Sequence, residues 1–124
     1  KALTGAWFEV VELMNAKNAA SKAALEHMAK ASGTDLAGFQ AQLDTTKLFA
    51  TPQEALAFAT SKQLPETMRR VAEFSFQHGL LGEGAKDTSA VGMAFANGVT
   101  SGDTGNLKLR FDPTYVQMAA DAKL

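Results

Sequence analysis

The sequence of 124 residues contains no cysteine and only two histidines. Without cysteine the chain can form neither a disulfide nor a metal site built from thiolates. No apolar run approaches the roughly 20 residues that a membrane-spanning helix requires. The charges are balanced, with 12 basic and 13 acidic side chains, so the sequence lacks the basic footprint expected for binding nucleic acid or an anionic membrane.

The remaining composition is that of an ordinary soluble globular protein, with 46% hydrophobic and 20% charged residues. A chain of this length fits one domain or one piece of a larger domain. The apolar pattern of a helix is already present from Ala2 to Trp7, with no capping residue or loop before it. We therefore expect the sequence to be one part of a longer chain.

Residues 1–79 carry the spacing of successive helices. The first helix places its apolar residues on one face, namely Leu3, Trp7, Val10, Val11 and Met14. Residues 15–18 interrupt it, and an alanine-rich second helix follows over residues 20–31. Gly33 is placed to end the second helix, and Thr34 is placed to cap a short third helix.

Two helix starts that contain proline follow, at Pro52 and Pro65. Thr51 and Pro52 form an N-cap and first helical residue, and Glu54 is placed to reach back to the cap amide. This helix is expected to run to about Ala59. Pro65 is expected to open the next helix, which ends near residue 79.

Turns and short strands are predicted after the helices. Seven of the ten glycines lie in residues 79–106, which excludes a long helix there. A strand over residues 91–95, an Asn97-Gly98 turn and an alternating strand over residues 107–111 are expected. Asp112 and Pro113 then start a closing helix. We predict a mainly α, helical array with a small β-hairpin element, divided into helices (1–79), a glycine-rich β segment (80–111) and a closing helix (112–124).

No catalytic or metal-binding arrangement emerges from the sequence. His27 and His78 lie on different predicted helices, and neither is expected to be a general base or a metal ligand. Residues 82–86 lack the strand and spacing of a phosphate-binding loop, so a solvent loop is predicted. Residues 102–106 have too few oxygen ligands for calcium, so a tight turn is predicted.

The charges in residues 66–73 have helical spacing. Arg69 and Arg70 lie three or four residues from Glu66 and Glu73, which predicts ion pairs along one helix. We expect these pairs to stabilise the helix rather than to form a site.

The order of motifs along the chain resembles one protein family. The sequence ETMRRVAEF at residues 66–74, followed by QHGLL at residues 77–81, resembles the late helix and stop of solute-binding proteins that serve nitrate/sulfonate/taurine-type ABC importers. The FDPTY sequence at residues 111–115 is similar to the acidic step that follows in that family. Upstream, WFEVV at residues 7–11 and KLF at residues 47–49 resemble two earlier landmarks.

A narrower resemblance concerns the glycine-rich part. The stretches at residues 82–86, 91–95 and 102–112 are similar to the variety of this family associated with urea carboxylase gene regions. The resemblance covers nearly the whole chain, but each motif is short and contains no invariant chemical group.

The resemblance implies a fold and a function. The chain would be the C-terminal segment of a two-lobed α/β periplasmic-binding-protein fold of type II. The whole protein would be periplasmic and non-catalytic, would need no cofactor, and would deliver a solute to an ABC transporter permease. That solute would be urea- or guanidine-like, or nitrate-, sulfonate- or taurine-like. Trp7, Lys47 and Phe49 lie near the family's inter-lobe stretches and are the ligand-contacting candidates.

Two alternatives remain at this point. One is an enzyme of the same architecture, such as a thiamine-pyrimidine synthase-like protein, which needs histidine and cysteine chemistry in an earlier portion. The other is a stand-alone helical interaction module. For a segment of a two-lobed protein we expect exposed apolar surface that the absent lobe would cover, and therefore self-association of this chain.

Overall fold

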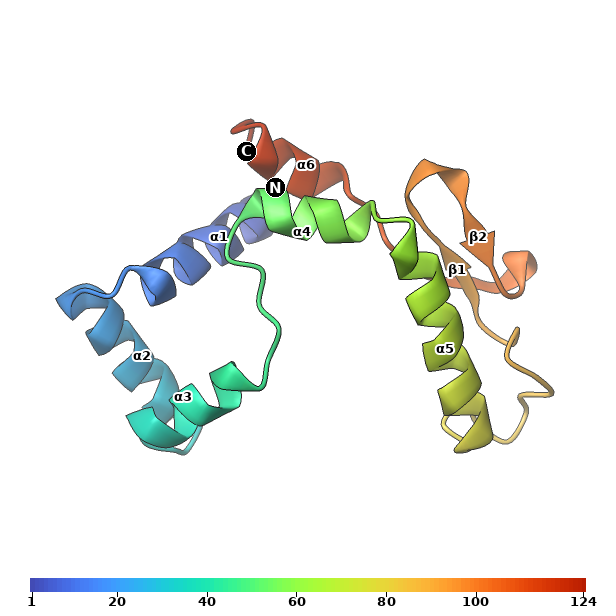
Figure 1. Cartoon of the computed structure of the whole chain (residues 1–124), viewed down its shortest axis with the longest axis horizontal. Coiled ribbons are helices and arrows are strands. Elements are labelled where there is room, and N and C mark those ends of the chain that lie inside the picture. Colours follow the sequence, from blue (N-terminus) through green and yellow to red (C-terminus); the bar gives the residue numbers. More distant parts are fainter. The chain divides into compact units, whose positions relative to one another are not determined.

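The computed structural model describes all 124 residues, apart from the side chain of Asn97. The chain forms two compact units, Lys1–Ala55 with Tyr115–Leu124, and Leu56–Thr114. We call them unit 1 and unit 2. Helices dominate and one small sheet is present, so the predicted mainly α class is confirmed (Figure 1).

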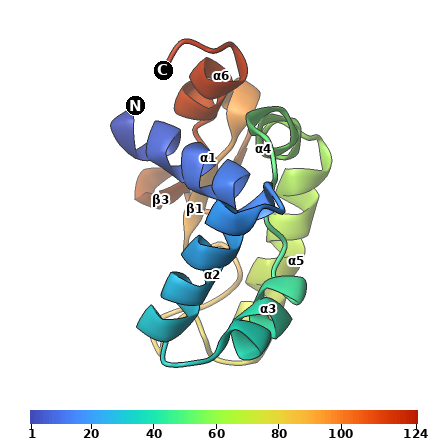
Figure 2. The same ribbon diagram turned by 90° about the vertical axis from the view of Figure 1, so that its left-hand side faces the viewer.

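Unit 1 begins with three helices that follow one another closely. They are α1 (Ala2–Asn15), α2 (Ala19–Ala31) and α3 (Leu36–Asp44). In Figures 1 and 2, α2 leads away from the end of α1, and α3 lies beside the far end of α2. The side chains of Val11 and Ala29 are buried, and the buried Ser21 hydroxyl donates a hydrogen bond to the Met14 carbonyl at 3.3 Å. These contacts hold the first two helices together.

The stop of α2 at Gly33 is as predicted, whereas the cap of α3 lies one residue later than predicted. Gly33 has φ +73°, and the Thr34 N–H donates to the Ala29 carbonyl at 3.0 Å, which closes a Schellman-type stop. Thr34 is therefore part of the end of α2 and does not cap α3, as we had expected. Asp35 caps α3 instead, because its carboxylate accepts the Gly38 N–H at 2.8 Å.

The next helix, α4 (Pro52–Ala59), begins at the predicted capping sequence. The Thr51 hydroxyl accepts the Glu54 N–H at 3.2 Å, as expected. The Glu54 carboxylate reaches one residue further back than predicted and accepts the Ala50 N–H at 3.0 Å. Glu54 therefore ties the incoming loop, rather than the cap residue itself, to the helix.

The helix α5 (Gln63–Gln77) begins two residues before the predicted start at Pro65. The Ser61 hydroxyl accepts the Leu64 N–H at 3.2 Å, and this bond supports the earlier first turn. Gly79 has φ +68°, and the Leu80 N–H donates to the Ser75 carbonyl at 2.8 Å, so the helix ends where predicted.

The core of unit 2 lies between α5 and the sheet. The side chains of Leu64, Met93 and Phe95 are buried together, and Phe111 packs against them. The rings of Phe95 and Phe111 are stacked, with their centroids 5.1 Å apart. Residues from α5, from the segment 92–95 inside the glycine-rich stretch and from Phe111, just after the last strand, therefore share this core.

The sheet contains three short strands in the order β2-β1-β3. The central strand β1 (Gly92–Ala94) is shorter than the predicted strand over residues 91–95. It pairs antiparallel with β2 (Thr100–Ser101), which was not predicted, through a 3-10 turn at Ala96–Gly98, and this confirms a hairpin turn at Asn97-Gly98. The strand β3 (Leu107–Arg110) lies on the other side of β1 and runs parallel to it. The helix α6 (Thr114–Ala120) then lies within the segment predicted to close the chain.

Two glycines permit the close approach of the strands and turns. A Cβ atom on Gly92 would lie 1.9 Å from the Asp103 carbonyl oxygen. Gly102 has φ +73°, and a Cβ atom there would lie 2.3 Å from the Val91 carbonyl oxygen. Both positions therefore require glycine, one for space and the other for space and backbone conformation.

We predict that Gly92→Ala destabilises the protein by about 2 kcal/mol or more, because backbone atoms must move to admit the methyl group. Gly84→Ala is the matched control, since Gly84 has open space around its Cβ position. Urea denaturation followed by circular dichroism measures both. Equal midpoints for Gly92→Ala and the unsubstituted protein would show that the close approach to Asp103 does not exist.

Candidate functional site

A pocket of about 350 Å³ lies in unit 1, within the size range of small-molecule sites. The end of α1, the middle of α2, the last part of α3 and the segment after α3 form its walls. Its polar lining consists of Asn15, Gln40, Asp44, Thr46 and Lys47. Met14, Leu25, Leu43 and Leu48 supply most of its apolar lining.

Opposite charges from neighbouring positions line this pocket. Asp44 is the last residue of α3, and Lys47 follows three residues later. The Gln40 amide nitrogen donates to the Asp44 carboxylate at 3.2 Å, which orients that carboxylate along α3. The Lys47 ammonium lies 5.7 Å from the centroid of the Phe49 ring, a cation–π distance. The Asp44 carboxylate is therefore oriented by Gln40, and the Lys47 ammonium lies against the Phe49 ring.

A second, wider groove of about 810 Å³ shares Met14, Asn15, Leu25 and Gln40 with this pocket. Lys17 contributes to the groove and has φ +50°, a conformation that is uncommon for a residue with a side chain. The Asn15 amide nitrogen donates to the Val11 carbonyl at 2.8 Å, so its amide oxygen remains the acceptor at the helix end. The break between α1 and α2 thus shapes both cavities.

The three sequence-predicted ligand contacts lie in different places. Lys47 lines the pocket, and Phe49 contacts the Lys47 ammonium. Trp7 lies two turns before the end of α1 with 53% of its surface exposed, and it is not part of the pocket lining. The structure therefore brings Lys47 and Phe49 together and leaves Trp7 apart.

Sequence reasoning missed Asn15, Gln40 and Asp44. The i, i+4 spacing of Gln40 and Asp44 places them on one side of α3. This spacing was the one feature of the sequence that could have indicated a shared polar surface. The sequence could not indicate that Asn15, 25 residues earlier than Gln40, lines the same pocket, because this depends on the packing of α1, α2 and α3.

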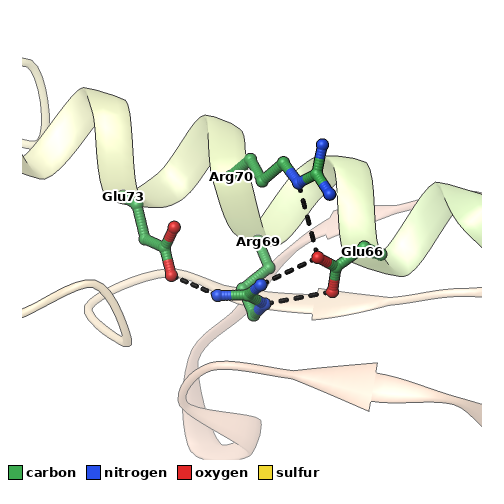
Figure 3. Close-up of polar contacts among 4 residues, drawn as sticks. All are labelled: Glu66, Arg69, Arg70 and Glu73. Atoms are coloured by element: carbon green, nitrogen blue, oxygen red, sulfur yellow. Dashed lines mark hydrogen bonds and ion pairs between the residues drawn. The ribbon is translucent and has the colours of Figure 1, made fainter.

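An exposed ion-pair network lies on α5 in unit 2 (Figure 3). The Arg69 guanidinium contacts Glu66 at 2.8 Å and also pairs with Glu73, while Arg70 contacts Glu66 at 3.4 Å. This confirms the predicted ion pairs at i,i+3 and i,i+4. The hydrogen bond from Arg69 and its positive charge hold the pKa of Glu66 below its ordinary value. The network forms a charged, exposed surface of α5.

Both histidines are exposed, and the side-chain contacts of His78 are with Phe74 of α5. His27 is exposed on α2. His78 is exposed at the end of α5, where its Nδ1 lies 2.8 Å from the Phe74 carbonyl oxygen. Its ring stacks on the Phe74 ring, with the two ring centroids 4.0 Å apart. In the part of the chain that the structure describes, no group of three or more His, Cys, Asp or Glu side chains could hold a metal ion.

The two glycine-containing loops also have structural roles. The Asp103 carboxylate accepts the Gly105 N–H at 2.8 Å and begins a 3-10 turn at Thr104–Asn106, which confirms the predicted tight turn. Residues 82–86 form a loop without regular structure, as predicted.

Comparisons with known proteins return no counterpart: the chain matches no protein-family model, no curated protein and no solved structure. Among the described residues, no helix has both the length and the apolar character needed to cross a membrane. The candidate site is thus defined by its geometry and by the motif resemblance alone.

We predict that Glu66→Gln lowers the thermal unfolding midpoint at pH 7. The folded-state pKa of Glu66 lies below the ordinary value of 4.5, so its stabilising contribution is present above pH 4.5 and is lost as pH falls through the lowered folded-state value. The difference between variant and unsubstituted protein should therefore shrink at low pH and in high salt.

Glu83→Gln is the control for this measurement. Glu83 is exposed in the loop after α5 and makes no ion pair among the described residues. Differential scanning calorimetry at pH 7 and at low pH compares the three proteins. A midpoint difference for Glu66→Gln that is independent of pH and salt would contradict the ion-pair assignment.

Proposed function

We propose that this chain is part of a periplasmic solute-binding protein that captures a small polar solute and passes it to an ABC importer. One observation carries the proposal: Lys47, a ligand-contacting candidate from the motif resemblance, lies in the wall of a pocket of about 350 Å³ together with Asp44 and Gln40. The order of the family-like motifs along the chain supports the same proposal.

The lining of the pocket defines the chemistry of the solute. Lys47 supplies hydrogen-bond donors and a positive charge, while Asp44 supplies acceptors and a negative charge. The amides of Asn15 and Gln40 offer neutral acceptors beside them. A small solute with several N–H donors or with an anionic group fits this lining. Binding would require only hydrogen bonds and ion pairs, with no bond broken or formed.

Four small solutes test different parts of this lining. Guanidinium would favour Asp44, nitrate would favour Lys47, and urea would use the neutral amides. Taurine carries both an ammonium and a sulfonate, so it would engage Asp44 and Lys47 together. The preferred solute therefore identifies which charge of the pocket dominates.

The mechanism that we propose is capture by closure. In a two-lobed binding protein of type II, a hinged cleft closes on the solute, and the transporter reads the closed form. We propose that the present chain is the C-terminal segment of such a fold and that its pocket contributes part of the solute contact. The helix ends that line the pocket would then fix the positions of Lys47 and Asp44 before the solute binds, which lowers the entropic cost of binding.

Neither alternative has a specific observation in its favour within the pocket. The thiamine-pyrimidine synthase-like enzyme would carry its histidine and cysteine chemistry in an earlier portion, and the pocket lining contains neither residue type. A helical interaction module would leave the opposite charges of Asp44 and Lys47 in the pocket without a role.

We predict that Lys47→Gln weakens binding of an anionic solute by about tenfold or more, because a hydrogen bond to a charged group contributes about 1.5–3 kcal/mol. Asp44→Asn should weaken guanidinium in the same way. Isothermal titration calorimetry of the full chain with urea, guanidinium, taurine and nitrate provides the measurement.

Lys30→Gln is the matched control, because Lys30 is an exposed lysine of α2 outside the pocket lining. It should bind every solute as the unsubstituted protein does. The proposal fails if none of the four solutes binds, or if Lys30→Gln and Lys47→Gln reduce binding equally.

A further inference from the structure

Unit 2 contains a cavity between α5 and the sheet, which we call the apolar cavity. Its volume is about 130 Å³, and all of its lining residues belong to unit 2. One face of α5 forms a wall, through four residues at i, i+3, i+4 and i+7, namely Met68, Val71, Ala72 and Ser75. Met93 of β1 and Leu109 of β3 form another wall.

The surface that faces the apolar cavity is almost entirely apolar, and no charged residue lines it. The pocket of the proposed function differs in this respect, because Asp44 and Lys47 belong to its lining. A further cavity of about 240 Å³, near the start of α5, has Lys62 in its lining. The apolar cavity therefore suits an uncharged ligand that brings no hydrogen-bonding group with it.

Water is a poor occupant of the apolar cavity. A buried water needs roughly two to four polar partners. The two polar side chains in the lining, Ser75 and Thr88, leave almost no polar surface toward the cavity. In other proteins an apolar cavity of about 150 Å³ stays dry and binds benzene. The apolar cavity has similar chemistry and nearly that size, so an apolar guest gains dispersion contacts there that water cannot replace.

The cavity has an inner end and a mouth. Met93 is 4% exposed and belongs to the buried core of unit 2, so it closes the inner end. Val71 and Leu109 are 46% and 38% exposed and lie at the mouth. A small guest can therefore enter past these two side chains without unfolding of α5 or of the sheet.

The two methionines of the lining favour an aromatic guest. Met68 comes from α5 and Met93 from β1. A methionine side chain adapts to the shape of a guest, and its polarisable sulfur makes favourable contacts with aromatic rings. We infer that the apolar cavity is a binding site for a small uncharged molecule built around one aromatic ring. This inference does not rest on the proposed function, because the pocket of that function lies in unit 1.

The five methionines of the chain make the inference directly measurable. Met68 and Met93 line the apolar cavity, whereas Met14, Met28 and Met118 belong to unit 1. In protein labelled with ¹³C at the methionine methyl groups, the ring current of bound benzene should shift the resonances of Met68 and Met93 and leave the other three unchanged. The titration should give a dissociation constant on the order of 1 mM. Unchanged Met68 and Met93 resonances, or shifts of similar size at all five methionines, would overturn the inference.

Filling the cavity should abolish the binding of benzene. Ala72 lines the cavity and packs against the core, so Ala72→Leu places a larger side chain in the space of the guest. Benzene should then bind about tenfold more weakly or not at all. Ala57→Leu is the matched control, because Ala57 is an exposed alanine of unit 2 outside the lining. This variant should bind benzene as the unsubstituted protein does.

Val71→Phe is a second filling variant, chosen because the 46% exposed Val71 lies at the mouth and its replacement removes little buried contact. Its ring should occupy the cavity and weaken benzene binding in the same way. Circular dichroism establishes which variants are folded. If a folded filling variant binds benzene as strongly as Ala57→Leu does, the inference is wrong.

The same labelled protein separates this inference from the proposed function. Met14 lines the pocket of the proposed function, so its methyl resonance reports on the binding of urea, guanidinium, taurine or nitrate. A solute in that pocket should shift Met14 and leave Met68 and Met93 unchanged, and benzene should do the reverse. Loss of one signal therefore overturns one proposal only.

Discussion

The hydrogen bonds at the helix ends of unit 1 are the constraint on which the candidate site depends. Asn18 accepts the Ser21 N–H at 2.9 Å and starts α2, while Asp35 starts α3. Few side chains are buried in this unit, so these local bonds largely decide where each helix stops and in which direction the next one leaves. The end of α1 and the end of α3 both reach the same pocket as a result, and they bring Asn15 and Lys47 to its walls.

Unit 2 depends on a different constraint, the close passage of one backbone segment past another. Gly92 admits the Asp103 carbonyl into the space that a side chain would occupy, so β1 can hold β2 on one side and β3 on the other. The strand β1 then presents Met93 to the core formed with Leu64 of α5. The charges of α5 stay at the surface, where the network around Arg69 stabilises the helix and leaves the interior apolar.

The pocket of the proposed function lies entirely within unit 1. The pocket joins polar groups from α1, from α3 and from the segment after α3, which suits a small solute with donors and acceptors. Met14 is the last apolar residue of α1, and it lines the pocket.

The sequence by itself determined the helices, because apolar periodicity, proline and capping residues act within a few positions of one another. The starts at Thr51 and the stops at Gly33 and Gly79 follow from such local chemistry. The order of motifs along the chain also predicted Trp7, Lys47 and Phe49 as ligand contacts, and of these three only Lys47 lines the pocket. Only the tertiary structure decided that β3 runs parallel to β1, and that Asn15, Gln40 and Asp44 join Lys47. These features depend on contacts between distant residues, whose formation balances packing against loop closure and leaves no local signal in the sequence.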